Sequence, residues 1–224
     1  MREVVLDTET TGLTPKTGHR IVEIGCLELV NLVPTGNVYH VYLNPERDMP
    51  EEAFNVHGLS ESFLRDKPKF EEIAEDFLEF VDGAQLVIHN AEFDMGFLNA
   101  ELKRMHRAEL GNVAVDTVRM ARQKFPGAHA NLDALCRRFG IDNSAREKHG
   151  ALLDAELLAE VYLELTGGRQ PGLLLSDDDK KPETTDVEVI AKTERKPRDH
   201  AASAEELEAH AAFLEKVDDP IWRA

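Results

Sequence analysis

The sequence of 224 residues predicts an α/β fold in which helices flank a mixed β-sheet. Three strand-like apolar runs follow one another near the N-terminus, and two later runs alternate with helical segments. Consecutive strands joined by turn signals such as Pro34-Thr35-Gly36 favour antiparallel hairpins, whereas strands that alternate with helices favour βαβ units. We expect strands near residues 3–7, 21–30, 36–43, 85–89 and 113–116, and helices near 70–82, 91–107, 117–125, 131–139 and 150–166.

The first predicted strand ends in two carboxylates. Val4-Val5-Leu6 reads as a strand buried on both faces, and Asp7 and Glu9 follow it. Side chains alternate along a strand, so these two acids point the same way, ~7 Å apart along the chain. Their mutual repulsion and desolvation are relieved by a divalent cation with hard oxygen ligands, such as Mg²⁺ or Mn²⁺. Asp-Thr-Glu taken alone favours a solvated strand end before a Thr10-Thr11-Gly12 turn, because Asp-x-Glu is a weak pattern.

Another acid follows the fourth predicted strand. The strand leads through Asn90, which either caps the next helix or orients the loop before it, and Asp94 lies in the first helical turn. Helical spacing puts Asp94 on the same face as Phe97 and Leu98, which we expect in the core. The helix dipole explains an acid near the N-terminus, but not one aligned with the apolar side. Asp94 is therefore a further candidate ligand.

The last predicted core helix carries an acid within its apolar stripe. Asp154 lies in that stripe by three-four spacing, and an acid on the core-facing side is costly unless it is paired or metal-bound. His149 precedes it by five residues, which would turn it ~140° away on an ideal helix. Both reach one site only if His149 lies on the preceding loop, a placement that Gly150 favours. The alternative for His149 is a surface loop histidine.

The sequence resembles the histidine-containing branch of the DEDD exonuclease superfamily, because it carries Asp-x-Glu, a later Asp and His-x4-Asp in that order. Further motifs, in the same order, are similar to the family of proofreading epsilon subunits of bacterial DNA polymerase III: Val5–Gly12, Phe54-x-Val56-His57-Gly58, Phe125-Pro126-Gly127, Leu132–Cys136 and His149–Ala155. The resemblance is dense over residues 1–168 and present in the tail at Glu206-x3-Ala209-His210 and Trp222-Arg223-Ala224. It implies an RNase H-like α/β fold.

The resemblance also implies hydrolysis of DNA from the 3′ end, with release of nucleoside 5′-monophosphates. Two divalent cations, Mg²⁺ or Mn²⁺, ~3.5–4 Å apart would hold the scissile phosphate and activate water. By this resemblance Asp7 bridges both metals, and Glu9, Asp94 and Asp154 complete their coordination. His149, with an ordinary pKa of ~6.5, suits the general base that takes the proton from water.

The same resemblance assigns five residues to the 3′-terminal nucleotide. Thr8 contacts it through its backbone, with Thr10 or Leu13 beside it, and His57 and Phe93 line the base pocket. Core packing explains Phe93 equally well, and a local turn explains His57.

The chain is acidic, with 26 Lys and Arg against 43 Asp and Glu and a formal net charge of −17. This balance argues against strong binding of DNA by the protein alone, although a polymerase that delivers the primer end would make weak binding sufficient. Basic residues gather within 103–148 and form either a phosphate-tracking face near His149 or an ordinary solvated surface. They include Lys103, Arg104, Arg107, Arg137, Arg138, Arg146 and Lys148.

Every site motif precedes residue 168, which predicts one exonuclease domain over residues 1–168. Cys26 and Cys136 are the only cysteines, and each lies in an apolar element, so we expect a reduced, cytoplasmic setting. The first strand begins near residue 3 and no apolar run is long enough to cross a bilayer. We therefore expect neither a signal peptide nor a membrane contact.

Two segments follow this domain. Residues 169–176 contain Gln170, Leu173 and Leu175, a pattern similar to the peptide by which bacterial replication proteins dock on the sliding clamp. The alternative is that the leucines fold back on the nuclease surface. Residues 177–202 are rich in Asp, Lys, Pro, Glu and Thr, which predicts a flexible linker.

Residues 203–224 predict a tail that binds a partner. Ser203 and Glu206 have capping-box spacing, and Leu207 and Leu214 belong to a one-sided apolar stripe too short to fold stably alone. Trp222, the only tryptophan, suits an anchor buried in another protein. The resemblance implies that this partner is the polymerase α subunit of the bacterial replisome, while docking on the nuclease domain is the alternative.

These inferences predict a 3′–5′ exonuclease that removes mispaired 3′-terminal nucleotides. Two alternatives remain: an exoribonuclease of the same fold that trims RNA ends, and a non-catalytic scaffold of the polymerase. The clamp-like peptide and the tail argue against the first. The presence of all five site residues argues against the second.

Overall fold

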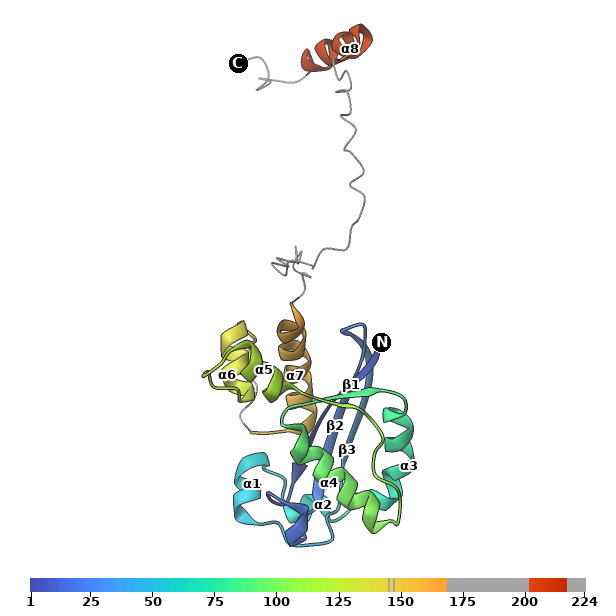
Figure 1. The fold of residues 1–224 in the computed structure, drawn as a ribbon, viewed down its shortest axis with the longest axis vertical. Coiled ribbons are helices and arrows are strands. Elements are labelled where there is room, and N and C mark those ends of the chain that lie inside the picture. Colours follow the sequence, from blue (N-terminus) through green and yellow to red (C-terminus); the bar gives the residue numbers. More distant parts are fainter. Residues whose placement is uncertain (145, 147, 169–201, 217–224) are drawn as a thin grey trace, which may run out of the picture. The chain divides into compact units, whose positions relative to one another are not determined.

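The computed structural model describes residues 1–144, 146, 148–168 and 202–216. The chain divides into two units, residues 1–175 and 176–224, each of which is described by itself. The first holds a five-stranded sheet with helices α1 to α7, and the second holds helix α8 (Ala204–Leu214) (Figure 1). None of the helices in the described ranges is both long and apolar enough to span a membrane.

The sheet is mixed, as predicted. Its strands lie in the order β3-β2-β1-β4-β5. Strands β1, β2 and β3 form antiparallel hairpins, whereas β4 runs parallel to both β1 and β5. Their bounds are β1 Arg2–Thr10, β2 Ile21–Val30, β3 Val33–Tyr42, β4 Gln85–Ile88 and β5 Ala114–Asp116.

The five predicted helices are present. They are α3 (Phe70–Val81), α4 (Ala91–Arg104), α5 (Thr117–Lys124), α6 (Leu132–Phe139) and α7 (Ala151–Thr166). Sequence reasoning missed α1 (Glu51–His57), α2 (Glu61–Leu64) and the short 3-10 helix η1 (Pro15–Thr17). Helix α1 has only seven residues and no side-chain cap at Pro50, so it lacks both the length and the capping signal by which a helix is recognised.

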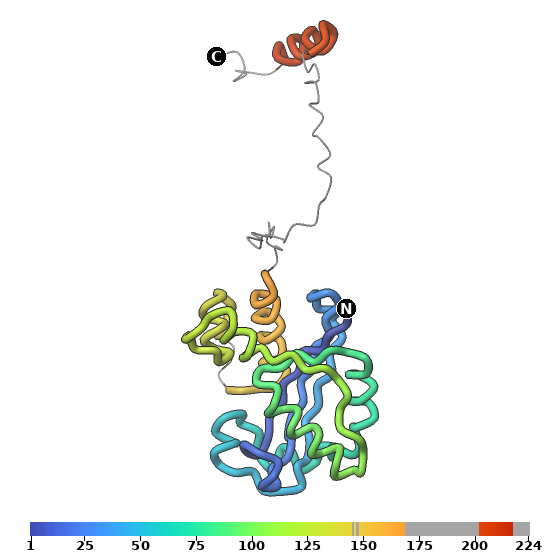
Figure 2. Tube along the Cα trace, in the orientation of Figure 1, coloured from blue at the N-terminus to red at the C-terminus, as the bar shows by residue number. Residues whose placement is uncertain are grey.

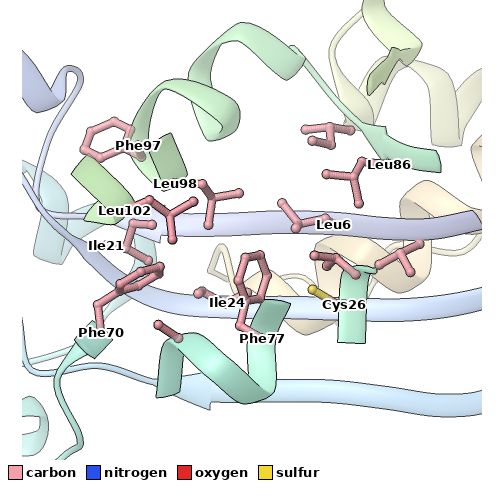
Figure 3. Close-up of a cluster of buried hydrophobic side chains, with 14 of the residues drawn as sticks. Leu6, Ile21, Ile24, Cys26, Phe70, Phe77, Leu86, Phe97, Leu98 and Leu102 are labelled. Carbon is pink, nitrogen blue, oxygen red and sulfur yellow. The ribbon is translucent and has the colours of Figure 1, made fainter. Parts of the chain in front are cut away.

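Two hydrophobic layers cover the two faces of the sheet (Figure 1). Leu6 and Ile24 face α3 and α4, where Phe77 and Leu98 pack against them (Figure 3). Val5, on the other face of β1, packs with residues of α5, α6 and α7. Because β1 is buried on both faces, its residues 4–6 form the continuous apolar run seen in the sequence. Cys26 and Cys136 are free thiols, one in each layer.

The predicted hairpin turn at Pro34-Thr35-Gly36 is wrong. The turn lies at Asn31-Leu32, whose φ angles of 52° and 67° are both left-handed. Two such residues give a hairpin loop whose twist matches that of the flanking strands. Pro34 and Gly36 lie inside β3 instead, at the edge of the sheet, where a missing ladder donor is tolerated.

In the second unit, α8 begins with the predicted capping box. Ser203 Oγ accepts a hydrogen bond from the Glu206 backbone N–H at 3.2 Å, and Glu206 Oε2 accepts one from the Ser203 N–H at 2.8 Å. Leu207 is exposed and Leu214 is buried. The predicted partner-binding residues Gln170, Leu173, Leu175 and Trp222 lie outside the described residues.

Candidate active site

Strand β1 delivers the first two acids. It runs beyond its predicted end at residue 7, to Thr10, so both Asp7 and Glu9 are strand residues paired with β2. Glu9 is buried and Asp7 half-buried. Thr8 points to the other face, where its Oγ1 donates a hydrogen bond to Asp94 Oδ1 at 2.6 Å. Strand parity therefore gives two carboxylates from one face and a hydroxyl that orients a third from the other.

Asp94 is only 2% exposed, in the first turn of α4 and beside Phe97 and Leu98 in the core. This confirms that the acid is on the apolar side of its helix. Asn90 precedes α4 in a left-handed conformation with φ of 70° and makes no side-chain capping bond, so the capping interpretation is wrong. His89 forms a hydrogen bond between its Nδ1 and Thr117 Oγ1 at 2.9 Å, which indicates a structural role.

Helix α7 supplies Asp154, which is 4% exposed. A Cβ atom on Gly25 of β2 would lie 2.4 Å from the backbone of Ala151, so only glycine lets the start of α7 rest on the sheet here. Gly25 is also the partner of Asp7 in the β1–β2 register. The contact brings Asp154 toward the strand that carries Asp7.

His149 lies on the loop before α7, as predicted, because α7 begins at Ala151 after Gly150. The backbone N–H of His149 donates to the carbonyl of Val56 in α1 at 3.2 Å. Figure 2 shows α1, in light blue, beside the segment that leads into α7, in orange. The overlooked helix α1 thus holds the loop that carries the candidate base.

The predicted residues converge. Ligand atoms of Glu9, His149 and Asp154 all lie within 4.8 Å of one another, and His149 Nδ1 is 3.3 Å from Asp154 Oδ2. Asp7 and Asp94 complete the acidic cluster, since burial first, and then the charges of Asp94, Glu9 and Asp154, raise the pKa of Asp7 well above its usual range.

The other pKa values show how strongly the acids interact. Burial, followed by repulsion from Asp154, raises the pKa of Glu9 to about 8. Burial raises the pKa of Asp94 to about 7, although the hydrogen bond from Thr8 acts in the opposite direction. Burial also acts to raise the pKa of Asp154, but hydrogen bonds from Arg146 and His149 outweigh it and lower the value. Clustered hard oxygen donors with excess negative charge fit a divalent cation, which would relieve the repulsion.

Arg146 belongs to this site, although the sequence placed it among surface phosphate contacts. Its side chain is 8% exposed. It hydrogen-bonds Asp154 through Nε at 2.5 Å and through a terminal nitrogen at 2.7 Å, and Asp133 at 2.9 Å. Its three-residue separation from His149 was the available signal, but nothing local shows that it points inward.

The other predicted basic residues each make local contacts of their own. Arg107 pairs with Glu75. Arg138 lies 4.4 Å from the centroid of the Phe125 ring, and Lys148 lies 5.0 Å from that of Phe54. Lys103 and Arg104 line a surface groove on α4, and the side chain of Arg137 turns back to the carbonyl of Asp133.

A cavity of about 500 Å³ opens beside the acids and is lined by all five residues predicted to contact substrate. Leu13, at its rim, is 87% exposed, and Phe93 packs against Phe97 with ring centroids 5.0 Å apart. His57 is buried, and its Nδ1 accepts a hydrogen bond from the Leu59 N–H at 3.0 Å. Its Nε2 therefore carries the proton, and it has no hydrogen-bond partner among the described residues. Thr8 and Thr10 also line this cavity.

Comparisons with known proteins agree with this geometry. A family model described as exonuclease, of the RNase T type, matches residues 4–162. The chain is 54% identical to DNA polymerase III subunit epsilon of Rickettsia felis, covering 97% of each chain. It is 44% identical to the epsilon subunit of Escherichia coli, covering 100% of this chain and 98% of that one.

Among solved structures, the fold is similar to that of exonuclease I, with a TM-score of 0.66 at 18% identity over 76% of this chain and 41% of that one. It is also similar to the nuclease domain of 3'hExo, a DEDDh family member bound to rAMP, with a TM-score of 0.65 at 16% identity over 74% of this chain and 91% of that one. At these identities the two structures support the fold alone.

Proposed function

Because the chain belongs to the RNase T-type exonucleases and, within them, to the DNA polymerase III epsilon subunits, we propose that its acidic cluster performs two-metal hydrolysis of mispaired 3′ ends. It is a 3′–5′ proofreading exonuclease subunit. The observation that carries the proposed mechanism is the convergence of four carboxylates and one histidine from three separate segments.

The cations would be held by Asp7, Glu9, Asp94 and Asp154, which offer only carboxylate oxygens, the donors that Mg²⁺ and Mn²⁺ prefer. When bound, such cations stabilise negative charge on the phosphate and lower the pKa of the attacking water. The raised pKa values of Glu9 and Asp94 mean that protons compete with cations for these oxygens near neutral pH.

His149 is the proposed general base. Its side chain is 47% exposed, so water reaches it, and Asp154 lies close enough to hold the ring. The ring takes a proton from water as the water oxygen bonds to phosphorus and the bond from phosphorus to the O3′ of the preceding nucleotide breaks. The products are a nucleoside 5′-monophosphate and a strand with a new 3′-hydroxyl.

The cavity beside the acids is the proposed site of the terminal nucleoside. Leu13 and Phe93 offer apolar surface to its base, and Thr10 and Glu9 line the same cavity. His57 also lines this cavity, so its ring lies beside the proposed nucleoside site.

The proposed partners follow from the tail. Residues 1–168 would form the exonuclease domain, 169–176 the clamp-docking peptide, 177–202 a flexible linker and 203–224 the segment that binds the polymerase α subunit. The support in the structure is α8, whose exposed Leu207 and Phe213 present apolar surface. The reducing bacterial cytoplasm is the proposed location, in accord with two free cysteines.

The mechanism is tested with 5′-labelled DNA bearing a mismatched 3′ end, incubated with Mg²⁺ or with a chelator. Stepwise shortening that requires the cation is expected, and His149→Ala should slow it by about 10²–10⁴-fold. His129→Ala, an exposed histidine outside the cluster, is the matched control and should leave the rate unchanged. Intact DNA with Mg²⁺ and with Mn²⁺ would contradict the mechanism and favour the scaffold alternative.

RNA of the same sequence tests the exoribonuclease alternative. Faster shortening of RNA than of DNA would favour an exoribonuclease. An Asp7→Ala protein that retains polymerase binding but loses hydrolysis would show that the catalytic and partner-binding roles are separable.

A further inference from the structure

The guanidinium of Arg146 contacts three groups at once. Both oxygens of Asp154 accept hydrogen bonds from it, at 2.5 and 2.7 Å, in the two-pronged geometry that binds carboxylates most strongly. A third nitrogen reaches Asp133 Oδ1 at 2.9 Å. The oxygens of Asp154 that would coordinate a cation are therefore already engaged by a positive charge from the protein.

The same guanidinium also lies beside His149. One of its terminal nitrogens is 2.8 Å from His149 Nδ1 and 3.5 Å from Nε2. Nδ1 is in turn 3.3 Å from Asp154 Oδ2. Arg146, Asp154 and His149 therefore form one polar cluster, in which Arg146 contacts both the acid and the candidate base.

Arg146 also forms an ion pair with a carboxylate of the site. Among the ion pairs of the described residues, those of Arg146 are the only ones that join a lysine or arginine to one of the four site carboxylates. Its side chain is nearly inaccessible, so solvent screens the pair weakly. Arg146 occupies the electrostatic role that a divalent cation would take.

We propose that Arg146 is a built-in counter-charge for Asp154, which competes with a divalent cation for the oxygens of this acid and is displaced from them when the cation binds. The proposal rests on the proposed metal site. Arg146 acts as a positioning residue, because it works through Asp154 and His149. Its displacement would free both oxygens of Asp154 as ligands for the cation.

Asp133 gives the displaced side chain a second partner. It lies in the first turn of α6, outside the candidate ligands, and Asn143 Nδ2 donates to its Oδ1 at 2.9 Å. Its side chain is 49% exposed, so solvent stabilises its charge in part. A guanidinium bound to Asp133 alone does not compete with the cation. Asp133 should therefore favour the state in which the cation is bound.

The proposal predicts opposite effects for the two partners, measured by calorimetric titration of the full chain with Mn²⁺. Arg146→Gln should bind Mn²⁺ about tenfold more tightly, because a charge-assisted hydrogen-bonded competitor is lost. Asp133→Asn should bind it more weakly, because Arg146 is left with Asp154. In chelator, Arg146→Gln should also unfold at a lower temperature, since the acids lose their counter-charge.

Arg122→Gln, an exposed arginine on α5, is the matched control for removal of one positive charge and should leave the Mn²⁺ affinity unchanged. Arg146→Lys keeps the charge but not the fork, and its affinity should lie between those of wild type and Arg146→Gln. Equal affinity in wild type and Arg146→Gln, or tighter binding in Asp133→Asn, would overturn the proposal. Absence of Mn²⁺ binding by the wild type would instead refute the metal site itself.

Discussion

The two halves of the candidate site are held in different ways. Asp7, Glu9 and Asp94 belong to a strand and a helix whose neighbouring residues are buried on both sides of the sheet. His149 and Arg146 belong to the loop between α6 and α7, which is held by polar contacts to Val56, Asp133 and Asp154. The first half is fixed by apolar packing and the second by hydrogen bonds and charge.

This difference fits the separate tasks of the acids and of the loop. Acids that must hold the same geometry in every catalytic cycle are placed where core packing resists movement. The loop that carries His149 and Arg146 is held by polar contacts, which are exchanged at lower cost than core packing. Changes to the acids of the first half should therefore abolish the site, and changes to the polar contacts of Arg146 in the second half should retune it.

The largest expected effect follows from removing the central acid. Asp7→Asn should lower the exonuclease rate by about 10³-fold or more, because a neutral amide is a poor ligand for a hard cation. The same change should raise the melting temperature in chelator, because a half-buried charge repelled by three others is lost. Gel-resolved DNA shortening and calorimetric melting are the measurements. A variant of unchanged rate would remove Asp7 from the mechanism.

The packing of α7 on the sheet is tested next. Gly25→Ala should force the start of α7 away from β2, because the added Cβ would meet the backbone of Ala151. Displacing Asp154 and His149 together should reduce the rate by about 10²-fold, a size expected for a misplacement of about 1 Å. Gly111→Ala, with open space around it, is the control for glycine substitution. Activity measured at a temperature where both variants remain folded decides the result.

A smaller effect is expected at the hydroxyl that orients Asp94. Thr8→Val keeps the shape but removes the donor to Asp94 Oδ1, so kcat should fall about tenfold with little change in KM for DNA. Thr8→Ser retains the donor and should restore most of the rate. If valine and serine behave alike, the hydrogen bond has no role in orienting Asp94.

The smallest effect concerns stability without metal. Because the folded pKa of Glu9, about 8, exceeds its ordinary value of 4.5, the folded state binds more protons than the unfolded state between these pH values. Stability in chelator should therefore fall as pH rises from about 4.5 to about 8. Glu9→Gln should flatten part of this slope in melting curves, whereas an unchanged slope would assign the effect to the other acids.

Much of the site could be predicted from local patterns. Strand parity placed Asp7 with Glu9, helical spacing placed Asp94 and Asp154 on apolar faces, and Gly150 placed His149 on a loop. The role of Arg146 could not be predicted, because it depends on Asp133 and Asp154 in other elements. The contact of Gly25 with Ala151 was hidden for the same reason, since it joins segments far apart in the chain.

The fold shows the same limit. Elements with a clear period or cap were found, whereas α1 and the Asn31-Leu32 turn were not. Leu32 is an unusual residue for a left-handed turn, and Pro34-Thr35-Gly36 gave a stronger but misleading signal. The pairing of β2 with β3 determines which of the two positions forms the turn, and local composition does not encode that pairing.

The alternation along β1 has a consequence for how the protein reaches its native state. Leu6 and Thr8 face one layer, whereas Asp7 and Glu9 face the other. A strand that paired one residue out of step would drive both carboxylates against the aromatic layer of α3 and α4 and turn Leu6 toward the acids. Such a misfolded hairpin would be strongly destabilised by the buried carboxylates. The acids that define the site therefore also disfavour incorrect pairing of the sheet that carries them.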